Sequence, residues 1–347
     1  MNFLLNRLDN LNISNKSFEF VPNNIKKEMN IDGMIVGTDG KLIVQNHDVM
    51  DLIKKSNIQR QIGINMYDAL MRKPMMIFLL PTQEEEFGRS LEELDEYYGM
   101  KLLFFNNLAQ AFSLGCWFVK DSCIAAVHAY WFNMFNGYNS QAKREIQVTL
   151  GNGHIAAVKL SDSEMEEAIK RMYEVCWYLS PEESKMGKVN KTRSMGTMVW
   201  EIDKAISTEG NSFARALIRL QEARRTGMLA SKIDKYCSVL ECLFAIRKNH
   251  KQNISRITAA YIGENDEEKE EIIKNLREAY GVRSDGSHGS KLNYLKKNNE
   301  ESLEELSSVV DDYTRRVFRK IIINKDLNYD TSAEKEAATR KYFHSLI

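Results

Sequence analysis

The sequence of 347 residues has no excess of charge of either sign. It contains 48 Lys plus Arg residues and 48 Asp plus Glu residues, so its formal net charge is zero. A protein that attracts nucleic acid through a global positive field carries an excess of basic residues. Any contact with RNA or DNA must therefore be local.

Cysteines are few, and no two of them form a C-x-x-C pair. Their number is odd, and their spacing does not match the ligand spacing of a zinc site. This pattern argues against both a zinc site and a disulfide framework, so we expect reduced, mostly buried thiols and neither a metal nor a cofactor. The five residues are Cys116, Cys123, Cys176, Cys237 and Cys242.

Long apolar runs are also missing. The longest, such as residues 75–80 and 124–132, are far too short to span a bilayer. The first residues lack the basic segment and the cleavage site of a signal peptide. No Walker loop or kinase-like motif occurs, which excludes the usual phosphoryl-transferring NTPases. We expect a cytoplasmic protein.

The patterns that are present indicate an α+β fold, with an N-terminal mixed α/β-sheet domain followed by a C-terminal all-α helical bundle. The length allows about two domains. In the first part, apolar spacing and turn residues predict helices at 58–72, 91–98 and 161–178 and a strand at 75–80. Asp-Gly, Asp-Ser and Asn-Gly turns predict hairpins that pair 34–36 with 42–44, 117–120 with 124–131, and 144–150 with 155–160.

From about residue 198 the pattern is helical, with almost no strand signal. Apolar residues at helical spacing predict helices at 212–226, 233–247, 254–262, 264–279 and 303–323. The basic, glycine-containing stretch before them is typical of a connector. We therefore divide the chain into an N-terminal domain, a linker with a connecting helix, a helical domain and a charged tail, at residues 1–180, 181–209, 210–325 and 326–347.

The stretch 280–289 is the part that looks most suited to chemistry. It combines Arg283, which is always charged, with His288, which can titrate near neutral pH. On an unbroken helix two side chains five residues apart diverge by about 140°. We expect glycines to bend the chain so that both side chains face one pocket. The glycines in this stretch are Gly281, Gly286 and Gly289.

A helical bundle with this stretch resembles the HEPN superfamily, whose mark is an arginine, a polar residue, a few variable residues and a histidine. The closest likeness is to the Apea-like HEPN family, over about residues 210–325. That family tends to carry a Leu-Glu pair on one helix, here Leu240-Glu241, and a Tyr-x-x-Arg-Ser-x-x-x-His-Gly ending on another, here Tyr280 to Gly289. Gly286 departs from the pattern, because members more often have a residue there that continues a helix.

The resemblance implies a metal-independent endoribonuclease of a toxin or antiphage defence system, with tRNA as one candidate substrate. In this reaction a ribose 2′-hydroxyl attacks the adjacent phosphate. Arg283 can hold the phosphate oxygens, and His288 can move a proton. Because the motif offers one histidine per chain, we expect a two-fold homodimer that brings two copies of the stretch together, as the resemblance also implies. The N-terminal domain could sense a phage or antitoxin trigger, bind RNA or restrain the nuclease.

Other residues have supporting or open roles. Ser284 could bond phosphate or fix the histidine, Asp285 could cap a turn, and Glu241 could face solvent or orient a side chain in the pocket. Three basic residues are candidates for RNA contacts, namely Lys291, Arg247 and Lys248. The alternative function is a non-catalytic HEPN interaction module or nucleotide-binding module, in which Arg283 and His288 serve the structure alone.

Overall fold

The computed structural model describes most of the chain. The described residues are 2–13, 17–19, 41–43, 53–80, 88–133, 137, 139–143, 147–179, 212–287, 291–324 and 333–347. The predicted linker at 181–209 lies entirely outside them, and so do His288 and the strand predicted at 34–36. None of the described helices combines the length and the apolar character needed to cross a membrane.

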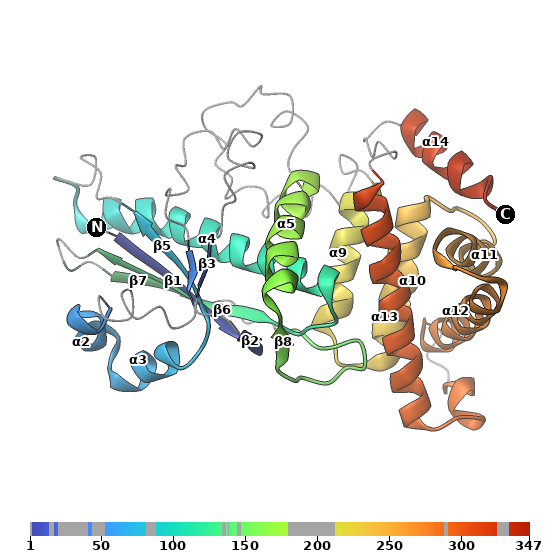
Figure 1. Cartoon of the computed structure of the whole chain (residues 1–347), viewed down its shortest axis with the longest axis horizontal. Helices are drawn as coiled ribbons and strands as arrows, with labels where there is room; N and C mark the ends of the chain where they lie inside the picture. Colours follow the sequence, from blue (N-terminus) through green and yellow to red (C-terminus); the bar gives the residue numbers. More distant parts are fainter. Residues whose placement is uncertain are drawn as a thin grey trace. The chain divides into compact units, whose positions relative to one another are not determined.

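The chain divides into two compact units, residues 1–146 with 157–200 and residues 147–156 with 201–347. The predicted α+β class with a helical C-terminal region is confirmed (Figure 1). The short stretch 147–156, which the sequence analysis placed in the N-terminal domain, packs within the second unit. There the Thr149 amide donates to the Arg224 carbonyl at 2.8 Å, and the Ser307 hydroxyl donates to the Gly151 carbonyl at 2.6 Å.

The first unit is built on a sheet of six strands in the order β3-β4-β5-β1-β6-β7, and every neighbouring pair in it is antiparallel. The central strand β1 pairs with β5 on one side and β6 on the other. The six strands are β1 (Asn2–Asp9), β3 (Ser17–Glu19), β4 (Lys41–Ile43), β5 (Met75–Leu80), β6 (Ala125–Asn133) and β7 (Asn139–Lys143). The strand predicted at 75–80 is therefore confirmed.

The two faces of this sheet bury different helices, because side chains alternate along each strand. Leu4 and Trp131 pack on one face in a core with α4 (Leu91–Val119) and α5 (Asp162–Leu179). Leu5 and Tyr130 pack on the other face with α2 (Ile58–Ile62) and α3 (Ile64–Met71). Figure 1 shows α2 and α3 on the opposite side of the sheet from α4.

Helix α4 corrects two predictions. It begins at Leu91 as expected, where Ser90 and Glu93 form a capping box, but it continues to Val119 instead of ending near residue 98. The predicted strand at 117–120 is therefore wrong. The second half of α4 is buried nearly all round, including Phe112, Leu114 and Trp117, so it lacks the polar face that reveals helical periodicity in a sequence.

The short strand β8 (Val158–Leu160) corrects another prediction. It pairs in parallel with β2 (Leu11–Ile13) and not with residues 144–150, of which 147–150 form no strand. The Asn-Gly turn does form, because the Leu150 amide donates to the His154 carbonyl at 2.8 Å. Strand β4 likewise pairs with β3 and β5, so both of its sides are occupied by strands other than the one predicted.

The second unit is helical, and each of its five predicted helices is present. Its elements are α9 (Ser212–Arg225), α10 (Leu229–Phe244), α11 (His250–Ile262), α12 (Asp266–Ser287), the short 3-10 helix η2 (Asn293–Lys296), α13 (Glu300–Ile323) and α14 (Ala333–His344). Helix α10 packs against α9, α12 and α13. Its wide apolar face is fully buried, as the periodicity predicted, at Ile233, Tyr236, Leu240, Leu243 and Phe244.

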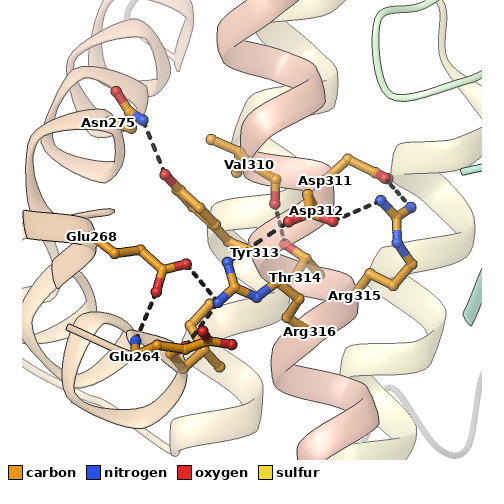
Figure 2. Close-up of polar contacts among 11 residues, drawn as sticks. Glu264, Glu268, Asn275, Val310, Asp311, Asp312, Tyr313, Thr314, Arg315 and Arg316 are labelled. Atoms are coloured by element: carbon orange, nitrogen blue, oxygen red, sulfur yellow. Dashed lines mark hydrogen bonds and ion pairs between the residues drawn. The ribbon is translucent and has the colours of Figure 1, made fainter. Parts of the chain in front are cut away.

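Polar side chains of α13 fix the positions of α10 and α12. Asp311 is completely buried and accepts hydrogen bonds from the Tyr236 hydroxyl of α10 at 2.5 Å and from Arg315 Nη1 at 2.7 Å. Figure 2 shows the contacts towards α12, where Arg316 donates to Glu268 at 2.7 Å and Asn275 donates to the Tyr313 hydroxyl at 3.0 Å. One helix thus holds the two helices that carry the candidate site.

The predicted charged tail contains a helix. In α14, Phe343 is fully buried, and its ring lies 4.5 Å from that of Phe244 and 5.3 Å from that of Tyr261, measured between centroids. Arg340 also donates from Nε to the Ala245 carbonyl at 2.8 Å. These contacts attach the C-terminal residues to the core of the second unit.

Replacement of Gly115 by alanine should destabilise the first unit. A Cβ atom at this position in α4 would overlap the Ala168 carbonyl oxygen of α5 and lie 3.0 Å from the Met172 nitrogen. Forcing two packed helices apart costs about 1–3 kcal/mol. The free energy of unfolding in urea can be followed by tryptophan fluorescence, because all four tryptophans lie within the first 200 residues.

The matched control is Gly99→Ala in the same helix. A Cβ atom there meets no other atom within 4 Å, and alanine favours a helix interior by about 1 kcal/mol over glycine. Gly99→Ala should therefore raise the unfolding midpoint while Gly115→Ala lowers it. Equal stability of the two variants would contradict the close packing of α4 on α5.

Candidate functional site

Glu241 and Arg283, which the sequence analysis placed on separate helices, meet in the second unit. Helix α10 presents Asp234 and Glu241, seven residues apart and so on one face. Arg283 of α12 donates from Nη1 to Glu241 Oε1, and its Nε lies 2.9 Å from Asp234 Oδ1. Of the two alternatives for Glu241, the structure therefore has it holding a side chain rather than facing solvent.

Tyr280 completes this contact from α12, one turn before Arg283. Its hydroxyl donates to Glu241 Oε1 at 2.9 Å. The Arg283 guanidinium lies over the Tyr280 ring, with its carbon 5.5 Å from the ring centroid, a geometry that suits a cation–π contact. Arg283 is thus held by two carboxylates and one aromatic ring, which together define its orientation.

Burial and charge set the protonation states of these groups. The Arg283 side chain is 26% exposed and that of Glu241 is 15% exposed. Burial alone would lower the pKa of Arg283, but the bond to the Glu241 carboxylate raises it above its ordinary value. Burial, helped by Glu241, raises the pKa of Tyr280 well above its usual range. At neutral pH the cluster therefore holds a charged arginine and a neutral tyrosine.

Cys237 is close to the cluster but is not suited to chemistry. It lies on α10 between Asp234 and Glu241 and is completely buried. Burial raises the pKa of its thiol, so the reactive thiolate is not formed at neutral pH. Cys237, Cys116 and Cys123 are all buried, as predicted for most of the thiols.

His250 is a site residue that the sequence analysis missed. It is the first residue of α11, and its Nδ1 lies 3.1 Å from Glu241 Oε1. No motif spacing connects it with Arg283, because the two residues come from different helices. Asp234, which was also missed, had a signal in the sequence, since it lies two helical turns before Glu241 on the same face.

The bend predicted for residues 280–289 is wrong for the part that the structure describes, which ends at Ser287. Helix α12 continues through Gly281 and Gly286, and neither glycine has a positive φ. A helical backbone at both positions is possible because any residue, glycine included, can adopt it, and the flanking contacts of Tyr280 and Arg283 favour it. His288 is the next residue after this helix and lies outside the described residues.

Asp285, which was predicted to cap a turn, lies within α12 and binds the first residue of η2. Its carboxylate accepts from the Asn293 amide at 2.7 Å and from Asn293 Nδ2 at 2.9 Å. These two bonds hold Asn293 against α12, eight residues after Asp285. Ser284 is exposed on α12, and no contact joins it to the Arg283 cluster within the described part of the chain.

The three basic candidates do not form one group in the described structure. Arg247 donates to Glu336 of α14 at 2.9 Å, so its charge serves the attachment of that helix. Lys248 and Lys291 are exposed, and no contact links either of them with Arg283 among the described residues. Their proposed contacts with RNA remain a prediction.

Neither metal-ligand geometry nor known relatives bear on the site. Among the described residues, no group of three or more His, Cys, Asp or Glu side chains is arranged to hold a metal ion. Comparisons of the chain with models of protein families, with curated proteins and with solved structures found no match.

The arrangement is chemically suited to bind an oxyanion. The two carboxylate contacts of Arg283 use Nε and Nη1, so a phosphate oxygen bonded to Nη2 would leave both contacts intact. A guanidinium that is already oriented loses little freedom when it binds a phosphate.

Replacement of Gly281 by alanine should stabilise the second unit. A Cβ atom there meets no other atom within 4 Å, and alanine in a helix interior favours folding by about 1 kcal/mol over glycine. The measurement is the free energy of unfolding in urea, followed by circular dichroism at the helical band.

Gly263→Ala is the matched control, because a Cβ atom there would lie 2.6 Å from the Ala259 carbonyl oxygen. That variant should lose about 1–3 kcal/mol from steric strain. A loss of similar size for Gly281→Ala would show that the backbone before Arg283 requires glycine, and the continuous helix would be refuted.

Proposed function

We propose that this chain is a metal-independent endoribonuclease that cleaves RNA at Arg283 on α12, with His288 as a proton-transfer group. One observation carries the proposal. Arg283 is an oriented, partly exposed guanidinium, held by Glu241 and Asp234, five residues before the histidine of the motif. This is the side chain that a phosphodiester needs to stabilise charge that develops on its oxygens.

The proposed reaction is an intramolecular transesterification at one phosphodiester of the RNA. The 2′-hydroxyl loses a proton and attacks the adjacent phosphorus, the bond from phosphorus to the 5′-oxygen breaks, and that oxygen gains a proton. The products are a 2′,3′-cyclic phosphate and a free 5′-hydroxyl. Arg283 balances the negative charge of the phosphate. His288 carries out one of the two proton transfers, either from the 2′-hydroxyl or to the 5′-oxygen. No metal is needed for any of these steps, as the resemblance also implies.

A non-catalytic module is the second candidate, and one observation favours it. Glu241 and Asp234 already balance the charge of Arg283, which would suffice for a structural ion pair between α10 and α12. In that case the helical unit would bind a protein partner or a nucleotide, and the exposed part of Arg283 would have no chemical role.

The assembly and the biological setting are further parts of the proposal. A homodimer whose two-fold axis passes near Arg283 would bring two copies of the motif to one phosphate. A protein that cleaves RNA, with tRNA as one candidate, must be restrained in its own cell. The resemblance to HEPN nucleases implies a role in toxin or antiphage defence, in which the first unit would respond to a phage or an antitoxin.

Loss of Arg283 should abolish most of the cleavage. Arg283→Ala and His288→Ala should each lower the rate of RNA cleavage by about a hundredfold or more, because one removes the phosphate contact and the other a proton-transfer group. The rate is measured on total RNA, with circular dichroism to show that each variant is folded. Arg277→Ala is the matched control, because Arg277 is an exposed arginine of the same helix.

Arg277→Ala should cut at the parental rate. If Arg283→Ala and His288→Ala also cut at that rate, the nuclease site is not here. If the parental protein cuts no RNA at all, the second candidate function replaces the first.

A further inference from the structure

His250 shares a carboxylate oxygen with Arg283. Its Nδ1 lies 3.1 Å from Glu241 Oε1, the atom that also accepts from Arg283 Nη1. Because both groups touch one oxygen atom, the imidazole and the guanidinium are immediate neighbours. Residues from three helices, α10, α11 and α12, thus meet at Glu241.

One nitrogen of the His250 ring is buried, while part of the side chain is exposed. Nδ1 is buried, whereas 39% of the His250 side chain is exposed. The exposed part of the ring therefore lies away from Glu241. The contact with Glu241 has an ion-pair distance but not the angle of a hydrogen bond.

The position of the carboxylate selects a tautomer. A carboxylate oxygen next to Nδ1 favours a proton on that nitrogen, so the neutral ring presents Nε2 as a proton acceptor. In hydrolytic triads an acid that is hydrogen-bonded to the histidine orients the general base; here the Glu241 carboxylate acts on the ring through its charge, at 3.1 Å from Nδ1. Glu241 would then have two tasks, since it holds the arginine that binds phosphate and the histidine beside it.

We propose that His250 is the general base that takes the proton from the attacking 2′-hydroxyl. This inference rests on the proposed ribonuclease function and adds a residue to its site. The proton passes from the 2′-hydroxyl to Nε2 while the bond from the 2′-oxygen to phosphorus forms. The bond from phosphorus to the 5′-oxygen breaks, and the 5′-oxygen takes a proton from a second group, for which His288 is the candidate.

The consequence concerns assembly. The expectation of a shared site arose because the motif has a single histidine for two proton transfers. With His250, one chain holds an arginine and a base for the same phosphate. A homodimer remains compatible with this arrangement, but the base does not have to come from the second chain.

The test compares two substitutions at His250 with one at a matched histidine. His250→Asn keeps an amide group near Glu241 but removes the proton acceptor, and His250→Ala leaves room for free imidazole. The control is His154→Asn in the same unit, because His154 Nε2 also faces a glutamate, Glu304, at 3.0 Å. The substrate is a synthetic single-stranded RNA of mixed sequence at saturating concentration, and binding is measured with its 2′-O-methyl analogue, which cannot react.

A general base predicts a specific pattern. Both His250 variants lose about a hundredfold or more of the saturated cleavage rate, bind the 2′-O-methyl RNA as the parental protein does, and have unchanged circular dichroism. Free imidazole restores part of the rate to His250→Ala. His154→Asn cuts at the parental rate.

Two results would overturn the inference while the ribonuclease proposal stands. In one, His250→Asn cuts at the parental rate, which would mean that His250 only holds Glu241. In the other, the loss lies in RNA binding and not in the saturated rate. If instead the parental protein does not cut, or Arg283→Ala cuts as well as the parental protein, the ribonuclease proposal itself fails and His250 has no base role.

Discussion

The ion pair between Arg283 and Glu241 is the interaction on which the second unit's candidate site depends. A guanidinium that is three-quarters buried must be balanced by charge close by, because a buried charge without a partner is strongly unfavourable. Glu241 and Asp234 supply that balance from one face of α10, and Tyr280 supplies a hydroxyl and a ring from α12. This requirement fixes which faces of α10 and α12 meet. The contacts of α13 with both helices then keep them in register.

The same ion pair limits what the site can do. Because two carboxylates already occupy Nε and Nη1 of Arg283, an RNA phosphate must use Nη2 or displace one of them. A phosphate brings more negative charge to a place that already holds Glu241 and Asp234, so neighbouring groups have to accept protons or supply positive charge. Arg247, a predicted RNA contact three residues before His250, supplies little positive charge for a phosphate, because it is bonded to Glu336.

Much of the fold could be predicted because local chemistry determines it. The helices of the second unit have one apolar face each, and Ser161 and Glu164 cap α5 as the sequence indicated. The second half of α4 could not be predicted, because a helix buried on all sides has no polar face. The parallel pairing of β8 with β2 depends on residues about 147 positions apart and has no local signal. Of the site, the helical pattern offered contact of Glu241 with a pocket side chain as one of two alternatives, and the resemblance paired its helix with that of Arg283. The place of His250 is set by packing between three helices.

The most direct test of the central claim is the chemistry of the RNA ends. The parental protein is incubated with total RNA in excess chelator, and both ends of the fragments are mapped. Attack by a 2′-hydroxyl at a site built from Arg283 and histidines predicts fragments with a 2′,3′-cyclic phosphate on one side of the cut and a free 5′-hydroxyl on the other. Fragments with 5′-phosphates, or cleavage that appears only when a divalent ion is added, would contradict it.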